Sequence, residues 1–342
     1  MDIKEHIEIK MRDIAGSVIA IIYTFEKETA KGFEHYAYWK SEVISAWLNA
    51  VEELGCIPYI IDVKTFMLKV AMGTLPHIDY CVNLNAGNVN LDNLCLVPSL
   101  ASFVGIQCIP CNAITCAVGE DKYFANQIAK NGKIKLPKEH IANIEGGIIR
   151  DRSLGSSVGI RKTNSETSCS ETELCQEFII GTDVTIPVLY NFVNERLEVL
   201  PPIAYKHKNG NEWFLSENAK LCHSYEKVSC KLSSDAETEI LKLAKSFDIK
   251  TYCRFDTRVE NYVFDNKHEI NLKDMNFIEI NPTPTVHNKI NFAMALVLAS
   301  NEIHHKQCFN AYKKLNSNSS ITGYILLCSI LSLKAKRFQL PD

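Results

Sequence analysis

The chain has 342 residues, 46% of them hydrophobic and 23% charged, and its formal net charge is −3. This composition is typical of a globular protein with ample apolar residues for a core, and the length favours two or three domains over one. The near-neutral charge and the lack of a long basic block speak against nucleic acid or an anionic membrane as a partner.

Strands and helices alternate over the first 115 residues, as in an open parallel sheet. Apolar runs predict the strands, and apolar residues at helical spacing predict the helices. In chain order we expect a strand at Ser17–Phe25, a helix at Lys40–Leu54, strands at Cys56–Val63 and His77–Leu84, a helix at Leu96–Val104 and a strand at Ile106–Pro110.

The elements after residue 115 are more mixed. In order they are a helix at Asp121–Lys130, a strand at Gly146–Arg150 that enters a polar loop, a strand region at Glu177–Tyr190, a helix at Ala236–Phe247 with Ser234 and Asp235 as caps, and helices from about Asn288 onward.

No targeting segment or metal-binding cysteine motif stands out. Met1–Asp13 lacks the apolar run of a signal peptide, and Ile321–Leu333 is too short to span a bilayer, so we expect a cytoplasmic protein. The 13 cysteines are scattered, and only Cys108 and Cys111 form a Cys-x-x-Cys pair. Free buried thiols are the simplest interpretation, and a zinc or redox role for this pair is the alternative.

The most informative segment is Met275–Asn281, which alternates as a strand does. Ile278 and Ile280 are expected to point into a core, and Glu279 and Asn281 to share the opposite face. A carboxylate and an amide oxygen held side by side suit a hard cation such as Mg²⁺, which prefers oxygen ligands.

A second alternating segment, Thr251–Asp256, precedes the first by about twenty residues. Here Arg254 and Asp256 share one face, with Cys253 and Phe255 behind them. The two strands together could build one metal–phosphate site. The alternative is two amphipathic strands with solvated outer faces.

A loop of small residues, Gly155–Gly159, follows a predicted strand. Glycines let the backbone approach a ligand, and exposed N–H groups with the hydroxyls of Ser156 and Ser157 can surround phosphate oxygens. No Gly-Lys-Ser/Thr follows, so this is not a Walker A loop, and a plain turn is the alternative.

Two cations and one later stretch could contact a nucleotide. Lys122 and Arg150 stand near the starts of predicted elements, where each could hold a phosphate or be a surface cation. Phe178 and Ile179 could line an adenine slot, with Asp183 accepting from ribose hydroxyls. An edge hairpin is the alternative for this stretch.

In chain order, these pieces resemble the D-alanine–D-alanine ligase family of ATP-grasp enzymes. The resemblance runs from about residue 17 to residue 290 and is strongest at Leu154–Gly159, Glu177–Leu189 and Arg254–Pro284. It implies an ATP-grasp fold of α/β and α+β class. The implied domains are an open α/β N-terminal domain over 1–115, a small lid domain over 116–187 and a C-terminal α+β catalytic domain over 188–342.

The resemblance also implies catalytic residues and metal ligands. Arg254 matches the arginine that stabilises the tetrahedral transition state, and Glu34 the glutamate that receives the first substrate's ammonium. Ser156 lies in the loop that covers phosphates and substrate. The matches to the ligands of Mg²⁺, which Mn²⁺ could replace, are Asp256, Glu279 and Asn281.

The positions matched to ATP contacts include two departures from the family. Arg150 stands where the family usually has lysine, and Gln176 where it usually has an acid. The full implied set is Lys122, Arg150, Ser156, Ser157, Gln176, Glu177, Phe178, Ile179, Asp183 and Lys220.

Other departures fall at substrate positions. The family's His-Gly pair is replaced around Asn85–Gly87, its loop-closing tyrosine by Leu221, and an oxyanion-hole glycine by Thr285. The nucleotide and metal positions are kept while the first-substrate positions change, which suggests the same reaction with altered substrates.

The resemblance thus implies an ATP-dependent, ADP-forming carboxylate–amine ligase that joins amino acids, or an amino acid and another carboxylic acid, through an acyl phosphate. Its partners would be small molecules rather than nucleic acid or a membrane, and the family suggests a homodimer. One alternative is a D-alanine–D-alanine ligase proper, which the changes at Asn85 and Leu221 disfavour. Another is a non-catalytic nucleotide-binding protein, which the retained metal ligands disfavour.

Overall fold

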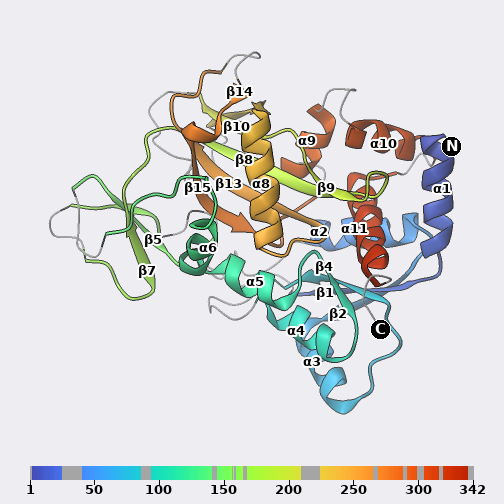
Figure 1. Ribbon diagram of the computed structural model, residues 1–342. Coiled ribbons are helices and arrows are strands. Elements are labelled where there is room, and N and C mark those ends of the chain that lie inside the picture. The colour runs from blue at the N-terminus through green and yellow to red at the C-terminus, as the bar shows by residue number, and fades with distance from the viewer. Residues whose placement is uncertain are drawn as a thin grey trace.

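The computed structural model describes residues 2–24, 41–85, 94–140, 145–155, 157, 159–164, 168–208, 224–264, 269–287, 291–298, 304–315 and 319–337. Within these ranges a parallel sheet lies at the bottom of Figure 1, a larger antiparallel sheet above it, and a small sheet projects to the left.

The parallel sheet occupies the N-terminal third, in the order β2-β1-β3-β4, and confirms the predicted open sheet. Residues 19–22 of the isoleucine-rich central strand are fully buried because helices cover both faces. Helix α3 is absent from the predicted elements. The elements are β1 (Val18–Tyr23), α2 (Ser41–Glu53), β2 (Ile57–Asp62), α3 (Val63–Met72), β3 (Tyr80–Leu84), α4 (Leu96–Phe103) and β4 (Gln107–Ile109).

The antiparallel sheet has the order β11-β10-β8-β13-β15, and β9 pairs with β8 at one end. Helix α8 covers one face, where the ring of Phe247 lies 6.2 Å from that of Phe255 and 6.4 Å from that of Phe277, measured between centroids. The elements are β8 (Thr182–Asn191), β9 (Arg196–Val199), β10 (Ile203–His207), β11 (Tyr225–Ser229), α8 (Ser234–Ser246), β13 (Tyr252–Val259) and β15 (Met275–Asn281).

The small sheet has the order β6-β5-β7, and two helices connect the parallel sheet to it. Both helices pack against β15, so they join the small sheet to the edge of the large one. The elements are α5 (Ala113–Glu120), α6 (Lys122–Ala129), β5 (Ile148–Asp151), β6 (Arg161–Lys162) and β7 (Glu173–Gln176). Elsewhere a two-stranded parallel pair, β12 (Lys231–Leu232) with β14 (Glu269–Ile270), lies beside the 3₁₀ turn Leu272–Asp274.

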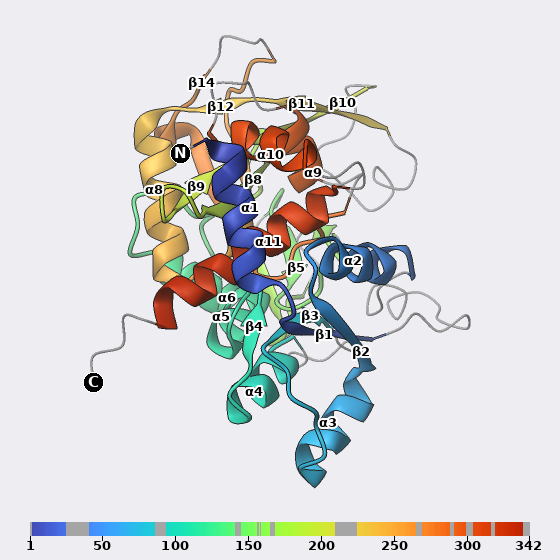
Figure 2. The same cartoon turned by 90° about the vertical axis from the view of Figure 1, so that its right-hand side faces the viewer.

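Helix α1 (Ile3–Ile14) packs against two of the last helices, α10 (His304–Lys313) and α11 (Ile321–Arg337), as Figure 2 shows. Helix α9 (Asn291–Leu298) packs against α10 and the large sheet. Glu53 of α2 accepts hydrogen bonds from the hydroxyl of Tyr312 and from the backbone N–H and hydroxyl of Ser320. Among the described helices, none has the length and apolar character needed to cross a membrane.

Two predicted elements need correction. The strand region Glu177–Tyr190 begins later than expected, because residues 177–181 form the connection between the small and the large sheet. A Cβ atom at Gly181 would lie 2.4 Å from the carbonyl oxygen of Val259. Only glycine lets the two backbone segments approach this closely. Helix α8 begins at Ser234, and the residue at its N-cap position is Ser233.

A β-bulge corrects the predicted alternation of β15. Asp256 pairs with Glu279, but the next residue, Thr257, pairs with Phe277, so Ile278 is an extra residue in its strand. Phe277 and Ile280 are therefore buried in the core, whereas Ile278 is only partly buried. The prediction that Ile278 points into the core is wrong, because the bulge turns it toward the side of Glu279.

Candidate functional site

A pocket of about 830 Å³ lies between the small sheet and the exposed face of the large one. Side chains of α6, β5, β7, β8, β13 and β15 line it, together with residues of β10 and β11. The predicted site residues that meet there are Lys122, Arg150, Ser157, Gln176, Glu177, Phe178, Ile179, Asp183, Arg254, Asp256, Glu279 and Asn281.

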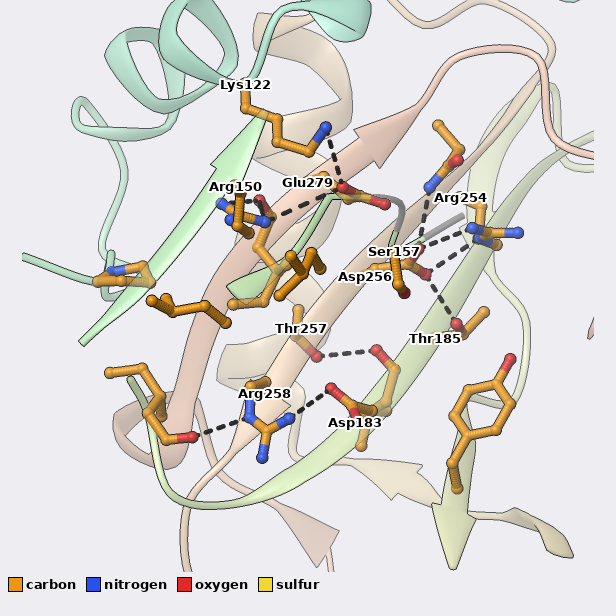
Figure 3. Close-up of a pocket in the computed structure, with 18 of the residues that line it drawn as sticks. Lys122, Arg150, Ser157, Asp183, Thr185, Arg254, Asp256, Thr257, Arg258 and Glu279 are labelled. Atoms are coloured by element: carbon orange, nitrogen blue, oxygen red, sulfur yellow. Dashed lines mark hydrogen bonds and ion pairs between the residues drawn. The ribbon is translucent and has the colours of Figure 1, made fainter. Parts of the chain in front are cut away.

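Two buried cations flank one carboxylate where the small sheet and α6 meet β15 (Figure 3). The Nζ of Lys122 lies 3.7 Å and the Nη1 of Arg150 lies 4.0 Å from the same oxygen of Glu279. Burial lowers the pKa of both cations, and Glu279 opposes this shift. Lys122 and Arg150 are 6% and 5% exposed, so neither is a surface cation. Two buried positive charges facing one negative charge favour a ligand that brings further negative charge.

Arg150 also connects the small sheet to the bulge. It donates from Nε and Nη2 to the Oε1 of Gln176, at 3.2 and 2.8 Å, and from Nη1 and Nη2 to the carbonyl of Ile278, at 3.3 and 3.2 Å. An arginine only donates, so the amide oxygen of Gln176 must face it. The Nε2 of Gln176 then points elsewhere, is buried, and has no hydrogen-bond partner in the described part of the chain.

The connection between the sheets is held by a residue that the sequence analysis does not single out. Arg258 donates to the carbonyl of Ile179 at 2.9 Å and to that of Gly181 at 2.6 Å, and it pairs with Asp183 at 2.9 Å. Its guanidinium lies 5.0 Å from the centroid of the Phe178 ring. The segment 177–183 is therefore fixed before any ligand binds.

The signal for Arg258 was present in the sequence. The alternation of Arg254 and Asp256 along β13 continues to Arg258, two residues further on the same face. Its partners lie 75 to 79 residues earlier in the chain, so only the sheet pairing reveals what it contacts.

Asp256 is the centre of a second cluster, on the large sheet. Arg254 donates to both of its oxygens, at 3.0 and 2.7 Å, Thr185 donates at 2.7 Å and the Nδ2 of Asn281 at 3.0 Å. Burial acts to lower the pKa of Arg254, but the charge and hydrogen bonds of Asp256, together with Tyr205 and Glu279, outweigh it, so the pKa is raised and the guanidinium stays charged.

The donor set of this cluster fits a hard cation. Asp256 and Glu279 are register partners on neighbouring strands, and Asn281 presents an amide whose nitrogen is already bound to Asp256. Carboxylate and amide oxygens are the ligands that Mg²⁺ and Mn²⁺ take. Over the described ranges, no group of three or more His, Cys, Asp or Glu side chains could hold a metal, so a cation at this cluster would take the amide oxygen of Asn281 as its third protein ligand.

Several predicted positions contribute differently or lie outside the described residues. Glu34, Ser156, Lys220 and Leu221 fall outside them. Ser157 lines the pocket with a φ of 66°, a left-handed conformation typical of a tight loop. The carboxylate of Glu177 accepts from the backbone N–H of Lys138 at 3.0 Å, so it helps fix the connection from the outside.

The cysteines and Asn85 lie away from the pocket lining. All twelve described cysteines are free thiols, and burial raises the pKa values of Cys108 and Cys111 well above the ordinary range. Asn85 is buried, and its backbone N–H donates to the side chain of Asn83 at 3.0 Å. Thr285 lines the pocket.

No protein-family model matches the chain. The D-alanine–D-alanine ligases of Legionella pneumophila strains Corby, Lens and Paris are each 25% identical to it over 212 residues, covering 52% of this chain and 57% of the relative. The chain thus spans little more than half the length of these relatives.

Solved structures are similar over most of the chain. D-alanine–D-alanine ligase from Bacillus anthracis, complexed with ATP, has a TM-score of 0.61 at 13% identity, covering 95% of this chain and 100% of that one. VanG D-Ala:D-Ser ligase from Enterococcus faecalis has a TM-score of 0.58 at 16% identity, covering 93% and 99%. A protein from Archaeoglobus fulgidus assigned to the ATP-grasp superfamily has a TM-score of 0.51 at 11% identity, covering 79% and 82%. The fold is therefore that of the ATP-grasp proteins, and the resemblance to D-alanine–D-alanine ligases is confirmed.

Proposed function

We propose that the chain is an ATP-dependent, ADP-forming ligase that joins a carboxylate to an amine. The observation that carries this proposal is the charge arrangement of the pocket. Two buried cations, Lys122 and Arg150, face Glu279. Asp256 is the partner of Glu279 on the neighbouring strand β13, and Asn281 follows Glu279 two residues later on β15. In an ATP-grasp fold, such an arrangement suits a metal-bound polyphosphate.

The nucleotide would lie along the connection between the two sheets. Its base would rest near Phe178 and Ile179, with the Nε2 of Gln176 donating to a ring nitrogen. Asp183, held by Arg258, would accept from the ribose hydroxyls. Lys122 and Arg150 would neutralise the phosphates. This part of the site is rigid because its side chains are already hydrogen-bonded, which lowers the entropic cost of binding.

Bound at Asp256, Glu279 and Asn281, Mg²⁺ would supply charge neutralisation at the phosphates. The substrate carboxylate oxygen attacks the γ-phosphorus, the bond to the bridging oxygen breaks, and ADP leaves. The amine then attacks the acyl carbon, phosphate leaves and the amine loses a proton. Arg254 stabilises the oxyanion of this second step, since its guanidinium stays charged beside Asp256.

We propose that the substrates differ from two molecules of D-alanine. The family's first-substrate histidine is replaced near Asn85, whose buried backbone is bound to Asn83. A site that hydrogen-bonds a particular substrate group discriminates strongly through that contact, so its loss changes the preference. The similar Enterococcus structure is named as a D-Ala:D-Ser ligase, so this fold accommodates a second amino acid other than D-alanine.

Three further features belong to this proposal. The chain would divide into domains at 1–115, 116–187 and 188–342, act as a homodimer, and work in the cytoplasm on small molecules. Sedimentation of the purified protein tests the dimer, and limited proteolysis tests the two domain boundaries.

The deciding experiment is a substrate screen. Purified protein receives ATP, Mg²⁺ and D-alanine, and then the same mixture with other amino acids and carboxylic acids. ADP and phosphate are measured, and mass spectrometry detects a condensed product that has lost water. We expect turnover with a pairing other than D-alanine alone.

Each other outcome has a distinct meaning. If D-alanyl-D-alanine forms more efficiently than any other product, the chain is a D-alanine–D-alanine ligase, the function that the names of its Legionella relatives favour. Release of AMP and pyrophosphate would contradict the acyl-phosphate mechanism. Nucleotide binding without cleavage for every pairing would favour the non-catalytic alternative.

A further inference from the structure

The ligand-facing side of the large sheet continues beyond the metal cluster. Partners across neighbouring strands share a face, as do residues two apart along a strand. Asp256 is the partner of Thr185, Thr185 of Ile203, and Tyr205, two residues after Ile203, is the partner of Lys227. Lys227 therefore projects from the same face as Asp256, and it lines the same pocket.

Among the described residues, five cations line this pocket, and four of them have a carboxylate partner. Lys122 and Arg150 share Glu279, as described above, and the other two ion pairs are Arg254–Asp256 and Arg258–Asp183. The side chain of Lys227, by contrast, has no hydrogen bond or ion pair to any residue within the described ranges.

The surroundings of Lys227 destabilise its charged ammonium group when no anion is bound to it. Its side chain is partly buried, and burial together with the nearby charge of Arg254 lowers its pKa. The rings of Tyr205 and Tyr225, 5.3 Å apart between centroids, line the same part of the pocket. A partly buried cation beside a second cation is stabilised by an anion that reaches it.

The position of Lys227 separates this anion from the reacting groups. Lys227 lies on β11, three strands from Asp256 on β13, in the order β11-β10-β8-β13. At the usual spacing of neighbouring strands, the two backbones are about 14 Å apart. At this separation, an anion bound by Lys227 need not be the carboxylate that reacts beside Asp256 and Glu279.

We propose that Lys227 binds a carboxylate of the substrate that does not react, so that one of the two joined molecules is a dicarboxylic acid, an acidic amino acid or an amino acid acceptor with a free carboxylate. This inference rests on the proposed ligase function. The shared chemistry is a non-reacting carboxylate, and its source is either the activated acid or the amine.

The two sources are separated by two assays. In the first, hydroxylamine serves as a neutral amine that traps the acyl phosphate as a hydroxamate, and glutamate and glutarate are compared with their amides, glutamine and glutaramate. In the second, the preferred acid is kept and amino acids are compared as acceptors with their uncharged α-amides. We expect one assay to favour the carboxylate by at least about tenfold in kcat/KM, as for one charged hydrogen bond.

The variants assign this preference to Lys227. Lys227→Met should abolish it, mainly through KM for that substrate, and Lys227→Arg should keep most of it. Lys206→Met is the matched control, because Lys206 lies on the neighbouring strand, is exposed, and stacks over the ring of Phe264 instead. A melting temperature for each variant establishes that it is folded.

A preference that survives in Lys227→Met overturns the proposal. A rise in KM for ATP alone also overturns it, and would assign Lys227 to the phosphates. A measurement without turnover separates this inference from the ligase function. Thermal stabilisation of the nucleotide-loaded protein by glutamate or glutarate, but not by the amides, and its loss in Lys227→Met, supports the binding site even if no product forms. Equal stabilisation by acid and amide contradicts it.

Discussion

The two ends of the pocket differ in how their charges are balanced. At the end formed by β5, β7 and the connection to β8, each cation contacts a carboxylate or a carbonyl, and Arg258 alone fixes three groups. At the end formed by β10 and β11, Lys227 has no such partner among the described residues. Under the proposed function, the balanced end would bind the nucleotide, which is the same in every reaction, and the unbalanced end would recognise the charge of the substrate.

The balanced end should fail most severely when its shared carboxylate is removed. Glu279→Ala would leave Lys122 and Arg150 without their common partner and remove a proposed metal ligand. A bound metal supplies several kcal/mol of transition-state stabilisation, so we expect turnover to fall roughly a hundredfold or more. ADP release at saturating Mg²⁺ measures this loss.

Glu226→Ala is the control for Glu279→Ala. Glu226 is an exposed carboxylate on β11 of the same sheet and is not among the residues that line the pocket. Turnover of this variant should stay within a few fold of the wild type. Near wild-type turnover of Glu279→Ala itself would show that the metal assignment is wrong.

Arg254 stands between the two ends, and its removal should act on the chemical step. Arg254→Ala should lower kcat by at least about a hundredfold, the loss typical of one oxyanion-stabilising donor. Steady-state kinetics with ATP and acceptor varied separately measure this. If only KM for ATP rises, Arg254 contacts the nucleotide and belongs to the balanced end of the pocket.

Arg258 should affect binding rather than chemistry. Arg258→Met removes the hydrogen bonds to the carbonyls of Ile179 and Gly181 and the pair with Asp183, so KM for ATP should rise about tenfold with little change in kcat. Arg196→Met is the control, because Arg196 is 71% exposed and pairs only at the surface. An unchanged KM for ATP would mean that the balanced end does not hold the nucleotide.

The smallest expected effect concerns stability away from the pocket. Burial lowers the pKa of His305 from 6.5 to about 4, although the charge of Glu198 and the carbonyl of Leu189 oppose this shift. Between pH 6.5 and 4 the unfolded chain binds a proton that the folded chain does not, so stability falls as pH decreases, by up to about 1.4 kcal/mol per pH unit.

Urea unfolding at several pH values tests the role of His305. We expect His305→Gln to flatten this slope, and an equal slope in variant and wild type would assign it to other groups. The same measurement gives the pH range in which the protein stays folded. Within that range, a loss of activity in the variants of either end of the pocket reflects the site and not unfolding.

The strands of the site were predictable because their signal is local. A period of two places Arg254 with Asp256, and Glu279 with Asn281, whatever the partner strand is. Antiparallel pairing then brings the four side chains together, as the structure shows. The same reasoning extends to the open parallel sheet, whose strands are continuous apolar runs.

The rest of the site depends on pairing between distant segments. The bulge at Ile278 exists only relative to β13, so no periodicity within its own strand reveals it. Two strands, β10 and β8, separate Lys227 on β11 from Asp256 on β13. Lys227 shares a face with Asp256 only because of the register in which these strands pair, including the pairing of Lys227 with Tyr205. The sequence shows which residues share a face of one strand. Which strands pair, and in which register, is determined by the whole fold.

The contact between the first and last helices has a consequence for synthesis on the ribosome. Ile7 and Trp47, from α1 and α2, share one hydrophobic core with Tyr324 of α11. Glu53 of α2 accepts hydrogen bonds from Tyr312 and Ser320. About 270 residues separate Glu53 from these partners in the chain, and at 5–20 residues per second their translation takes on the order of tens of seconds. During that time the apolar faces of α1 and α2 lack the residues that cover them in the folded protein, and such exposed apolar surface favours aggregation.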